Sequence, residues 1–500
     1  MGRTASKPSQ LEASAHTGPA ELCPRPPPTP ARARRPSIDT EQRAAAVAEA
    51  QTRAELRGGG GVSVLHIKAM AIRLRHRVQS TPRHPEASSY VAVDIVPKRS
   101  KEEHSDLAGV MAIVIHPLSS LLVAFPLGIA AHMRGWGALP TFWLNIMALI
   151  PLAKILGDGT EELAAAIKND TVSGLLNATL GNAVEMILSV QTLRRGLLEV
   201  VKATLLGSIL SNILLVLGTS FLLGGLTGSS KSHSRNHIIH LDGYKPARCT
   251  LEKEQFFSSK NALVNMAMQL LACMTCALPT VFAAESDLEE TRDKVVEVSR
   301  IGAVIIMFAY VAYIVFQLHT HKTMLALDEG QGSDDEDEED DEGGLSAGAA
   351  VLLMAVTTVL VSISSEFLSS AIDEVVKHCG IPERFIGIIV LPFAGNACEH
   401  ASAVRFAMQD RLGLSIGIAV GSSTQIALFV VPFTVIVGWL LGQPMDLVFG
   451  TMNTTVMILG VLVVLTLVID GRSNWLKGFM LCIAYLFCAV LYWCMPPHLD

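Results

Sequence analysis

A five-residue pattern that occurs twice inside apolar sequence limits the possible folds of this chain more than any other feature. Gly181-Asn182-Ala183-Val184-Glu185 lies in the apolar run 175–190, and Gly395-Asn396-Ala397-Cys398-Glu399 repeats it later in the chain at an offset of 214 in the numbering. Gly207-Ser208 returns as Gly421-Ser422 at the same offset. A carboxylate inside a membrane-length apolar segment is a functional-site hypothesis by default, and a repeated pair is typical of a transporter binding site.

The composition indicates an all-α polytopic membrane protein. Half of the 500 residues are hydrophobic and 17% are charged, whereas about 25% are charged in an average soluble protein. Several apolar stretches exceed about 18 residues, the length that crosses a bilayer as a helix. The predicted spans are 108–131, 138–156, 171–193, 203–226, 258–283, 296–318, 345–371, 383–406, 412–441, 446–469 and 475–494.

These eleven transmembrane helices divide into one extra N-terminal helix and two inverted five-helix repeats. Five is an odd number, so the second repeat must enter the membrane from the opposite side. The predicted parts are a disordered cytosolic regulatory arm at 1–107, the extra first helix at 108–131, the first repeat at 138–318, an acidic cytosolic linker at 319–344, and the second repeat at 345–494.

The distribution of positive charge sets the expected orientation. The first 100 residues carry 16 Lys and Arg against 8 Asp and Glu. The positive-inside rule therefore places the arm and the basic loop 227–257 in the cytosol, and eleven spans place the C-terminus in a lumen. Arg194, Arg195 and Lys202 fall on the lumenal side against this rule.

The repeated motif has the chemistry of a divalent cation site. Glu185 and Glu399 would neutralise one divalent ion, and Asn182 and Asn396 would either add amide oxygens or cap broken helices. Backbone carbonyls near the motif glycines would complete the shell. Oxygen ligands suit Ca²⁺ or Mn²⁺ better than thiolate-seeking metals. Without an ion, two buried carboxylates repel each other and take up protons, which is a mechanism for exchange. The alternative is that each Glu is a hydrogen-bonded structural residue. The whole predicted set is Gly181, Asn182, Ala183, Glu185, Gly395, Asn396, Ala397 and Glu399.

Accessory groups have weaker support. His400 directly follows Glu399 and is either a proton relay or a packing residue. Glu162 and Glu366 are either access-site carboxylates or solvated helix ends. Further polar oxygens are available from Ser208, Ser211, Ser422 and Gln425, although serine commonly bonds its own helix. We interpret Cys273 and Cys276 as packing residues, and Gly413, Gly417 and Gly421 as points of close helix contact.

Two segments outside the spans are candidates for regulation. Ser37 follows Arg34-Arg35-Pro36, which is either a basic-directed kinase site or an ordinary basic linker. The acidic run is either a solvated linker or a Ca²⁺ sensor, and it lacks the glycine and glutamate register of an EF-hand. It comprises Asp334, Asp335, Glu336, Asp337, Glu338, Glu339, Asp340, Asp341 and Glu342.

Over residues 108–494 the sequence resembles the vacuolar cation/proton exchanger family of the Ca²⁺/cation antiporter superfamily. The resemblance lies in Gly-Asn-Ala-x-Glu at 181–185, Gly-Asn-Ala-x-Glu-His at 395–400, the acidic run and the extra first helix. It implies H⁺-driven Ca²⁺ loading of an acidic compartment, with Glu185 and Glu399 as the central ion- and proton-binding carboxylates. It also implies an N-terminal regulatory arm, usually inhibitory.

We therefore expect a Ca²⁺/H⁺ antiporter, with Mn²⁺ as a second candidate substrate, in a vacuolar or other acidic-organelle membrane. The alternatives are a Na⁺-coupled Ca²⁺ exchanger and a cation channel. No His-Glu-x-x-His motif supports an intramembrane enzyme. We expect membrane lipid as a partner, no nucleic acid and no cofactor, with Ca²⁺ as substrate and candidate regulator. A homo-oligomer remains open.

Overall fold

The computed structural model describes residues 106–167, 169–227, 254–285, 290–321 and 345–495. All of them belong to the compact unit Arg99–Asp500. The predicted arm up to residue 105, Ser37 and the acidic run 334–342 lie outside the described residues.

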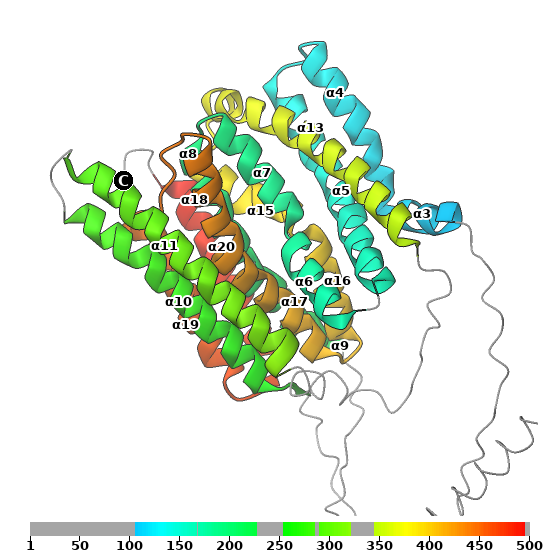
Figure 1. The fold of residues 1–500 in the computed structure, drawn as a ribbon, viewed down its shortest axis with the longest axis vertical. Helices are drawn as coiled ribbons and strands as arrows, with labels where there is room; N and C mark the ends of the chain where they lie inside the picture. The colour runs from blue at the N-terminus through cyan, green and yellow to red at the C-terminus, as the bar shows by residue number, and fades with distance from the viewer. Residues whose placement is uncertain (1–105, 168, 228–253, 286–289, 322–344, 496–500) are drawn as a thin grey trace, which may run out of the picture. The chain divides into compact units, whose positions relative to one another are not determined.

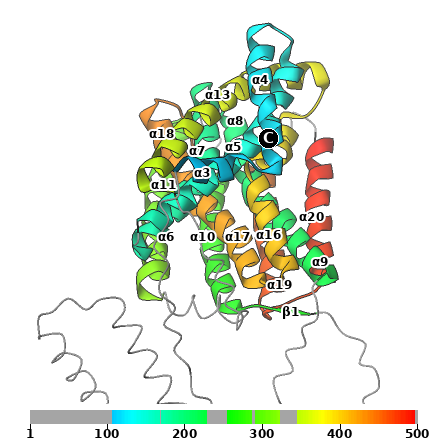
Figure 2. The same cartoon turned by 90° about the vertical axis from the view of Figure 1, so that its right-hand side faces the viewer.

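The described part of the chain is almost entirely helical, as the composition predicts (Figures 1 and 2). Its first half contains α3 (Asp106–Val114), η1 (Pro117–Val123), α4 (Ala124–Met133), α5 (Ala138–Ala166), α6 (Asp170–Leu180), α7 (Ala183–Arg194), α8 (Leu198–Leu210), η2 (Ser211–Val216), α9 (Leu217–Thr227), β1 (Gln255–Phe256), α10 (Ser259–Ala284), α11 (Glu290–Val315) and η3 (Phe316–Thr320).

The second half contains α13 (Ala347–Cys379), α14 (Glu383–Phe385), η5 (Ile386–Val390), α15 (Leu391–Gly395), α16 (Ala397–Met408), α17 (Leu412–Gln425), η6 (Ile426–Val430), α18 (Val431–Leu440), α19 (Thr451–Val468), β2 (Arg472–Ser473) and α20 (Trp475–Cys494). The two short strands pair antiparallel, with Gln255 opposite Ser473.

Eight helices of the described residues are long and apolar enough to cross a membrane, and two bent helix pairs raise the number to ten. Residues 106–133 bend by 81°, where Pro117 starts a new helix, and residues 383–408 bend by 61°. The predicted spans 108–131 and 383–406 are therefore not straight helices. The remaining predicted span, 171–193, consists of α6 and α7, which are separate helices divided at Gly181–Asn182.

Irregular turns occur at matching places in the two halves. The helix breaks at Asn182 and Asn396 stand at equivalent positions of the repeated motif. The π-helical segments η2 and η6 end at Val216 and Val430, which are related by the same offset in the numbering. A π-helical turn is wider than an α-helical turn and is often found at functional sites. Two of the helix irregularities therefore recur at the offset of the sequence motif, whereas η5 and η3 have no such counterpart among the described residues.

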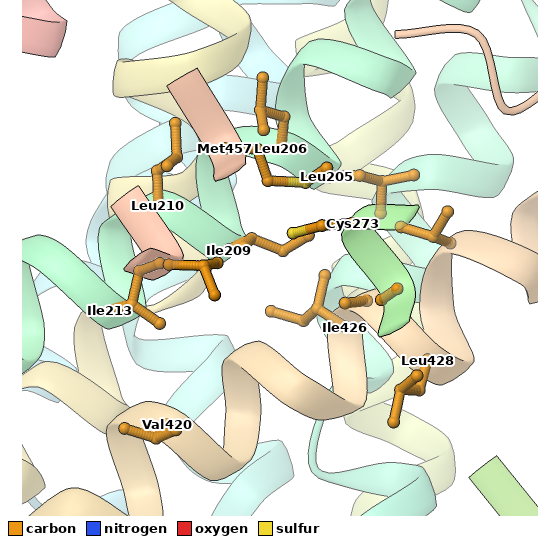
Figure 3. Close-up of a cluster of buried hydrophobic side chains, with 14 of the residues drawn as sticks. Leu205, Leu206, Ile209, Leu210, Ile213, Cys273, Val420, Ile426, Leu428 and Met457 are labelled. Carbon is orange, nitrogen blue, oxygen red and sulfur yellow. The ribbon is translucent and has the colours of Figure 1, made fainter. Parts of the chain in front are cut away.

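The two largest clusters of buried apolar side chains in the described residues both include residues of the broken helices. The larger joins α8, η2, α10, α17, η6 and α19, with Leu206, Ile209, Ile426 and Met457 in contact around Cys273 (Figure 3). The smaller joins α5, α7, α13 and α15. Within this smaller cluster, α5 and α13 lie side by side (Figure 1). Cys273 and Cys276 are free, buried members of the larger cluster, which confirms the packing interpretation.

Close helix contact occurs at a different glycine from those predicted. A Cβ added to Gly417 or Gly421 would meet nothing within 4 Å, so the interpretation of these two glycines as contact points is wrong. A Cβ added to Gly207 would lie 2.2 Å from the Ile388 carbonyl oxygen. The backbone of α8 therefore packs directly on η5, which leads into the second motif.

Candidate ion-binding site

Each motif sits where one helix ends and another begins. Asn182 is the residue before α7, and Asn396 is the residue before α16. Glu185 and Glu399 therefore fall in the first turn of the following helix. The N-terminal end of a helix carries partial positive charge and favours a carboxylate. Asn182 and Asn396 are both 1% exposed and Glu185 is 6% exposed.

The two asparagines bind across the halves of the protein. Asn182 Nδ2 donates a hydrogen bond to Gln425 Oε1 at 2.8 Å, and Asn396 Nδ2 donates to the Ser208 carbonyl oxygen at 3.3 Å. Neither side chain caps the helix that it precedes. Of the two roles considered for these asparagines, capping is therefore wrong. Both Oδ1 atoms are left buried without a hydrogen-bond partner.

The two carboxylates have different surroundings. Glu185 lies against the backbone of the second motif, because a Cβ at Gly395 would be 2.7 Å from Glu185 Oε1. Glu399 Oε1 accepts a hydrogen bond from Ser422 Oγ at 2.8 Å, and its Oε2 is buried without a partner. The two side chains are close enough to interact electrostatically. The tertiary structure thus brings the two predicted carboxylates into one place.

Asn212 is a further polar residue of this site that sequence reasoning missed. It is fully buried in η2, and both its amide atoms lack a hydrogen-bond partner. Its side chain is near enough to interact with Glu399, although by distance and angle no hydrogen bond joins the two. Its counterpart in the repeat is the apolar Ile426. Comparison of the two halves therefore could not reveal it, whereas an asparagine within the apolar run 209–217 was an available signal.

The unpaired atoms define what the site can hold. They include four buried oxygens: Asn182 Oδ1, Asn396 Oδ1, Asn212 Oδ1 and Glu399 Oε2. A buried oxygen without a partner costs free energy unless a ligand, a water or an ion satisfies it. Within the described ranges, no three His, Cys, Asp or Glu side chains gather to hold a metal ion. Two carboxylates with amide oxygens are instead a donor set for a hard, oxygen-seeking cation.

The other predicted residues divide between the site and its surroundings. Ser208, Ser422 and Gln425 each contribute a hydrogen bond to the motif residues, as described above. Ala183 and Ala397 are the first residues of α7 and α16. His400 Nε2 shares a hydrogen bond with Thr219 Oγ1 at 2.8 Å, which ties α16 to α9.

Glu162 and Glu366 have partners away from the motifs. Glu162 Oε2 accepts a hydrogen bond from the Leu345 amide at 2.8 Å, just before α13. Glu366 is 52% exposed and lies 3.7 Å from Arg195, which follows α7. Arg195 is one of the basic residues that fall on the lumenal side against the positive-inside rule, and in the structure it pairs with the Glu366 carboxylate.

A second group of charges approaches the site from α5. Lys154 and Asp158 form an ion pair on this helix. Helix α5 packs against α16, and both residues, together with Glu161, lie near Cys398 of the second motif. Acidic side chains therefore lie beside Cys398, one residue before Glu399.

Membrane-length helices around buried carboxylate and amide oxygens define an integral membrane protein that binds cations. A sequence profile described as sodium/calcium exchanger protein matches residues 137–319 and 349–494. The chain is 36% identical over 400 residues to vacuolar cation/proton exchanger 2 of Oryza sativa, which covers 79% of this chain and 85% of that protein. It is 38% identical over 386 residues to the Ca²⁺/H⁺ antiporter of Synechocystis, which covers 75% of this chain and 96% of that protein.

Solved structures show the same likeness. The Ca²⁺/H⁺ antiporter protein YfkE is 28% identical with a TM-score of 0.58, over 78% of this chain and all of that chain. The H⁺/Ca²⁺ exchanger CAX shares the fold at 14% identity and a TM-score of 0.54, over 78% of this chain and 93% of that chain. The chain belongs to the vacuolar cation/proton exchangers of the sodium/calcium exchanger family.

Proposed function

We propose that this protein is a Ca²⁺/H⁺ antiporter that moves cytosolic Ca²⁺ into an acidic compartment. The observation that carries the proposal is the proximity of Glu185 and Glu399, together with the unpaired buried amide oxygens of Asn182 and Asn396 in the same motifs and of Asn212 near Glu399. Relatives named Ca²⁺/H⁺ antiporter and vacuolar cation/proton exchanger support the choice of Ca²⁺ and H⁺ as the exchanged ions. Mn²⁺ prefers the same oxygen ligands and is a second candidate substrate.

Exchange follows from competition for one set of oxygens. The two carboxylates together balance one divalent charge, and they repel each other when neither a cation nor a proton is present. Ca²⁺ therefore binds when both are ionised, and protons displace it when the site faces the acidic side. Because each carboxylate accepts one proton, the site returns with up to two protons for each Ca²⁺.

The energetics agree with this stoichiometry. A ten-thousandfold Ca²⁺ gradient costs about 5.5 kcal/mol before any membrane potential. One proton crossing a difference of about two pH units supplies about 2.7 kcal/mol. Two protons per Ca²⁺ are therefore the minimum for such a gradient. At this ratio exchange moves no net charge, so a membrane potential does not change its driving force.

The conformational part of the proposal is alternating access between two inverted repeats. The matching breaks at Asn182 and Asn396 and the matching π-helical turns support such a repeat, with α6 and α7 together as the remaining span of eleven. In this arrangement the N-terminus is cytosolic and the C-terminus lumenal, and the site is exposed first to one side and then to the other. The vacuolar names of the relatives support an acidic organelle as the location.

The test is proton-driven ⁴⁵Ca²⁺ uptake into proteoliposomes with an acidic interior. Glu185→Gln and Glu399→Gln preserve shape but remove the balancing charge, so each variant is expected to lose uptake while remaining folded. Glu374→Gln changes an exposed carboxylate of α13 and serves as the matched control, with unchanged uptake. Near-normal uptake in either motif variant would overturn the paired-carboxylate site.

The same vesicles separate the alternatives. Replacing Na⁺ with an inert cation stops a Na⁺-coupled exchanger but leaves proton-driven uptake intact. Collapse of uptake on addition of a protonophore excludes a channel that follows the Ca²⁺ gradient alone.

A further inference from the structure

Lys202 is a cation that is almost fully buried at the start of α8. Its side chain is 8% exposed, and its Nζ lies 2.8 Å from Asp446 Oδ1 and 3.2 Å from Glu199 Oε1. Glu199 is one turn away on the same helix and is 65% exposed, whereas Asp446 is 19% exposed and lies between α18 and α19. The pair with Asp446 is therefore the less exposed one, and it joins two distant parts of the chain.

The loop that carries Asp446 is fixed to the larger apolar cluster. Met445, Leu447 and Phe449 are each at most 3% exposed, although the loop contains no helix or strand. Asp446 Oδ1 also accepts a hydrogen bond from the Val448 amide at 2.9 Å, which shapes the loop around the carboxylate. The Phe449 amide donates to Thr280 Oγ1 of α10 at 3.3 Å. The Asp446 carboxylate is consequently held at a fixed point of the molecule.

Helix α8 connects this fixed point to the ion-binding site. Ser208 lies six residues after Lys202, about 9 Å along the helix at 1.5 Å per residue. Its carbonyl oxygen accepts the hydrogen bond from Asn396 Nδ2. Asn212, which interacts with Glu399, follows four residues later in η2. An axial shift of α8 would therefore move both of these groups relative to the second motif.

The close contact of Gly207 with η5 limits the axial position of α8, and the ion pair adds a directional restraint to it. The buried positions of α8 are mostly Val, Leu, Ile and Ala, and apolar contacts of this kind are non-directional. An ion pair fixes one register because only one alignment of helix and loop brings the two charges together. The repeat counterpart of Lys202 is Ile416, so the repeat contains no second copy of this pair.

We infer that Lys202 is a positioning residue of the exchange site, which acts by holding α8 against Asp446 in the register that places the Ser208 carbonyl opposite Asn396. This inference rests on the proposed Ca²⁺/H⁺ exchange. It assigns no direct contact with Ca²⁺ to Lys202. Its consequence is that removal of the pair weakens Ca²⁺ binding through Asn396, without removing any oxygen from the site.

The experiment measures the apparent KM for Ca²⁺ in proteoliposomes and equilibrium ⁴⁵Ca²⁺ binding in detergent for Lys202→Met. Loss of alignment in one net hydrogen bond corresponds to about a fivefold change, so KM and Kd are each expected to rise about fivefold while the maximal rate is largely kept. Asp446→Asn breaks the same pair from the other side and is expected to change KM in the same direction. Asp446→Asn also tests the inference if Lys202→Met does not fold.

Two further variants distinguish positioning from general stability. The exchanged pair Lys202→Asp with Asp446→Lys restores opposite charges and is expected to return KM to within about twofold of the wild type. Lys477→Met removes another lysine–aspartate ion pair, with Asp470 at 2.7 Å, and is expected to leave KM unchanged.

Lowered thermal stability with unchanged KM and Kd in Lys202→Met or Asp446→Asn would overturn the inference. An equal rise of KM in Lys477→Met would also overturn it. A wild-type protein that shows no Ca²⁺/H⁺ exchange would instead contradict the proposed function, which keeps the two failures distinct.

Discussion

Gly395 has no side chain at the point where the Glu185 carboxylate passes it. A Cβ at this position would lie 2.7 Å from Glu185 Oε1, closer than Cβ contacts in real structures. Glu185 belongs to the first motif and Gly395 to the second, so the glycine of one copy makes room for the carboxylate of the other. The motif thus needs its glycine for space around the neighbouring glutamate, in addition to any role in breaking the helix.

Gly395→Ala is therefore expected to impair transport by displacing the Glu185 carboxylate. Overpacking of a tight site costs about 1–3 kcal/mol, which corresponds to at least about a fivefold fall in the initial ⁴⁵Ca²⁺ uptake rate. Gly417→Ala is the matched control, because a Cβ there meets nothing within 4 Å. Equal uptake by the two variants would contradict the crowding of Glu185 against the second motif.

Ser422→Ala tests the hydrogen bond that supports Glu399. The hydroxyl donates to Glu399 Oε1 at 2.8 Å and so stabilises the ionised carboxylate that Ca²⁺ requires. A hydrogen bond to a charged group is worth about 1.5–3 kcal/mol, so we expect a rise of about tenfold or more in KM for Ca²⁺. Thr455→Ala, which removes an exposed hydroxyl bonded to its own helix, should leave KM unchanged. A KM that does not depend on Ser422 would show that this bond has no role in binding.

Asp470 gives a prediction for the pH dependence of stability. Burial acts to raise the pKa of this carboxyl, but hydrogen bonds from Lys477 and the Arg472 amide hold the pKa below its ordinary value. A lowered pKa in the folded state stabilises the protein above the unfolded value of about 3.9, and this stabilisation is lost as the pH falls through the folded pKa. Asp470→Asn should therefore lower the melting temperature at pH 7. It should not change the melting temperature at a pH below the pKa of Asp470 in both the folded and the unfolded state.

The expected loss at pH 7 is small, because an ion pair at an exposed site contributes about 0–1 kcal/mol. Melting curves of the purified protein from pH 7 downwards measure this loss. Asp293→Asn changes another exposed carboxylate and serves as the control. A difference between wild type and Asp470→Asn that grows as the pH falls would have the wrong sign.

The acidic run 334–342 carries a prediction that comes from the sequence alone. Nine adjacent carboxylates repel each other, and bound Ca²⁺ relieves that repulsion. The run ends three residues before Leu345, whose amide donates to Glu162 of α5. Neutralising 334–342 to Asn and Gln is therefore expected to change how uptake depends on cytosolic Ca²⁺ without abolishing transport. Superimposable uptake curves across a Ca²⁺ series would reduce the run to a solvated linker.

The sequence alone determined the class of protein and the centre of its site. Apolar runs of membrane length dictate helices, because a backbone in lipid must satisfy its hydrogen bonds internally. The cost of burying a carboxylate makes Glu185 and Glu399 stand out in such runs without any knowledge of the fold. In the structure both copies of the motif coincide with a helix break, at Asn182 and at Asn396.

The tertiary structure decided which atoms remain available to an ion. The sequence left capping and ligation open for the asparagines, and only the partners Gln425 and Ser208 show that their Oδ1 atoms are free. The proximity of Asn212 to Glu399 and the pair of Lys202 with Asp446 likewise required the tertiary structure. Their partners lie in the other half of the chain, and neither Asn212 nor Lys202 has a polar counterpart in the repeat. Local patterns specify which residues are buried, but long-range packing specifies which buried polar groups meet, and that pairing determines the unpaired oxygens.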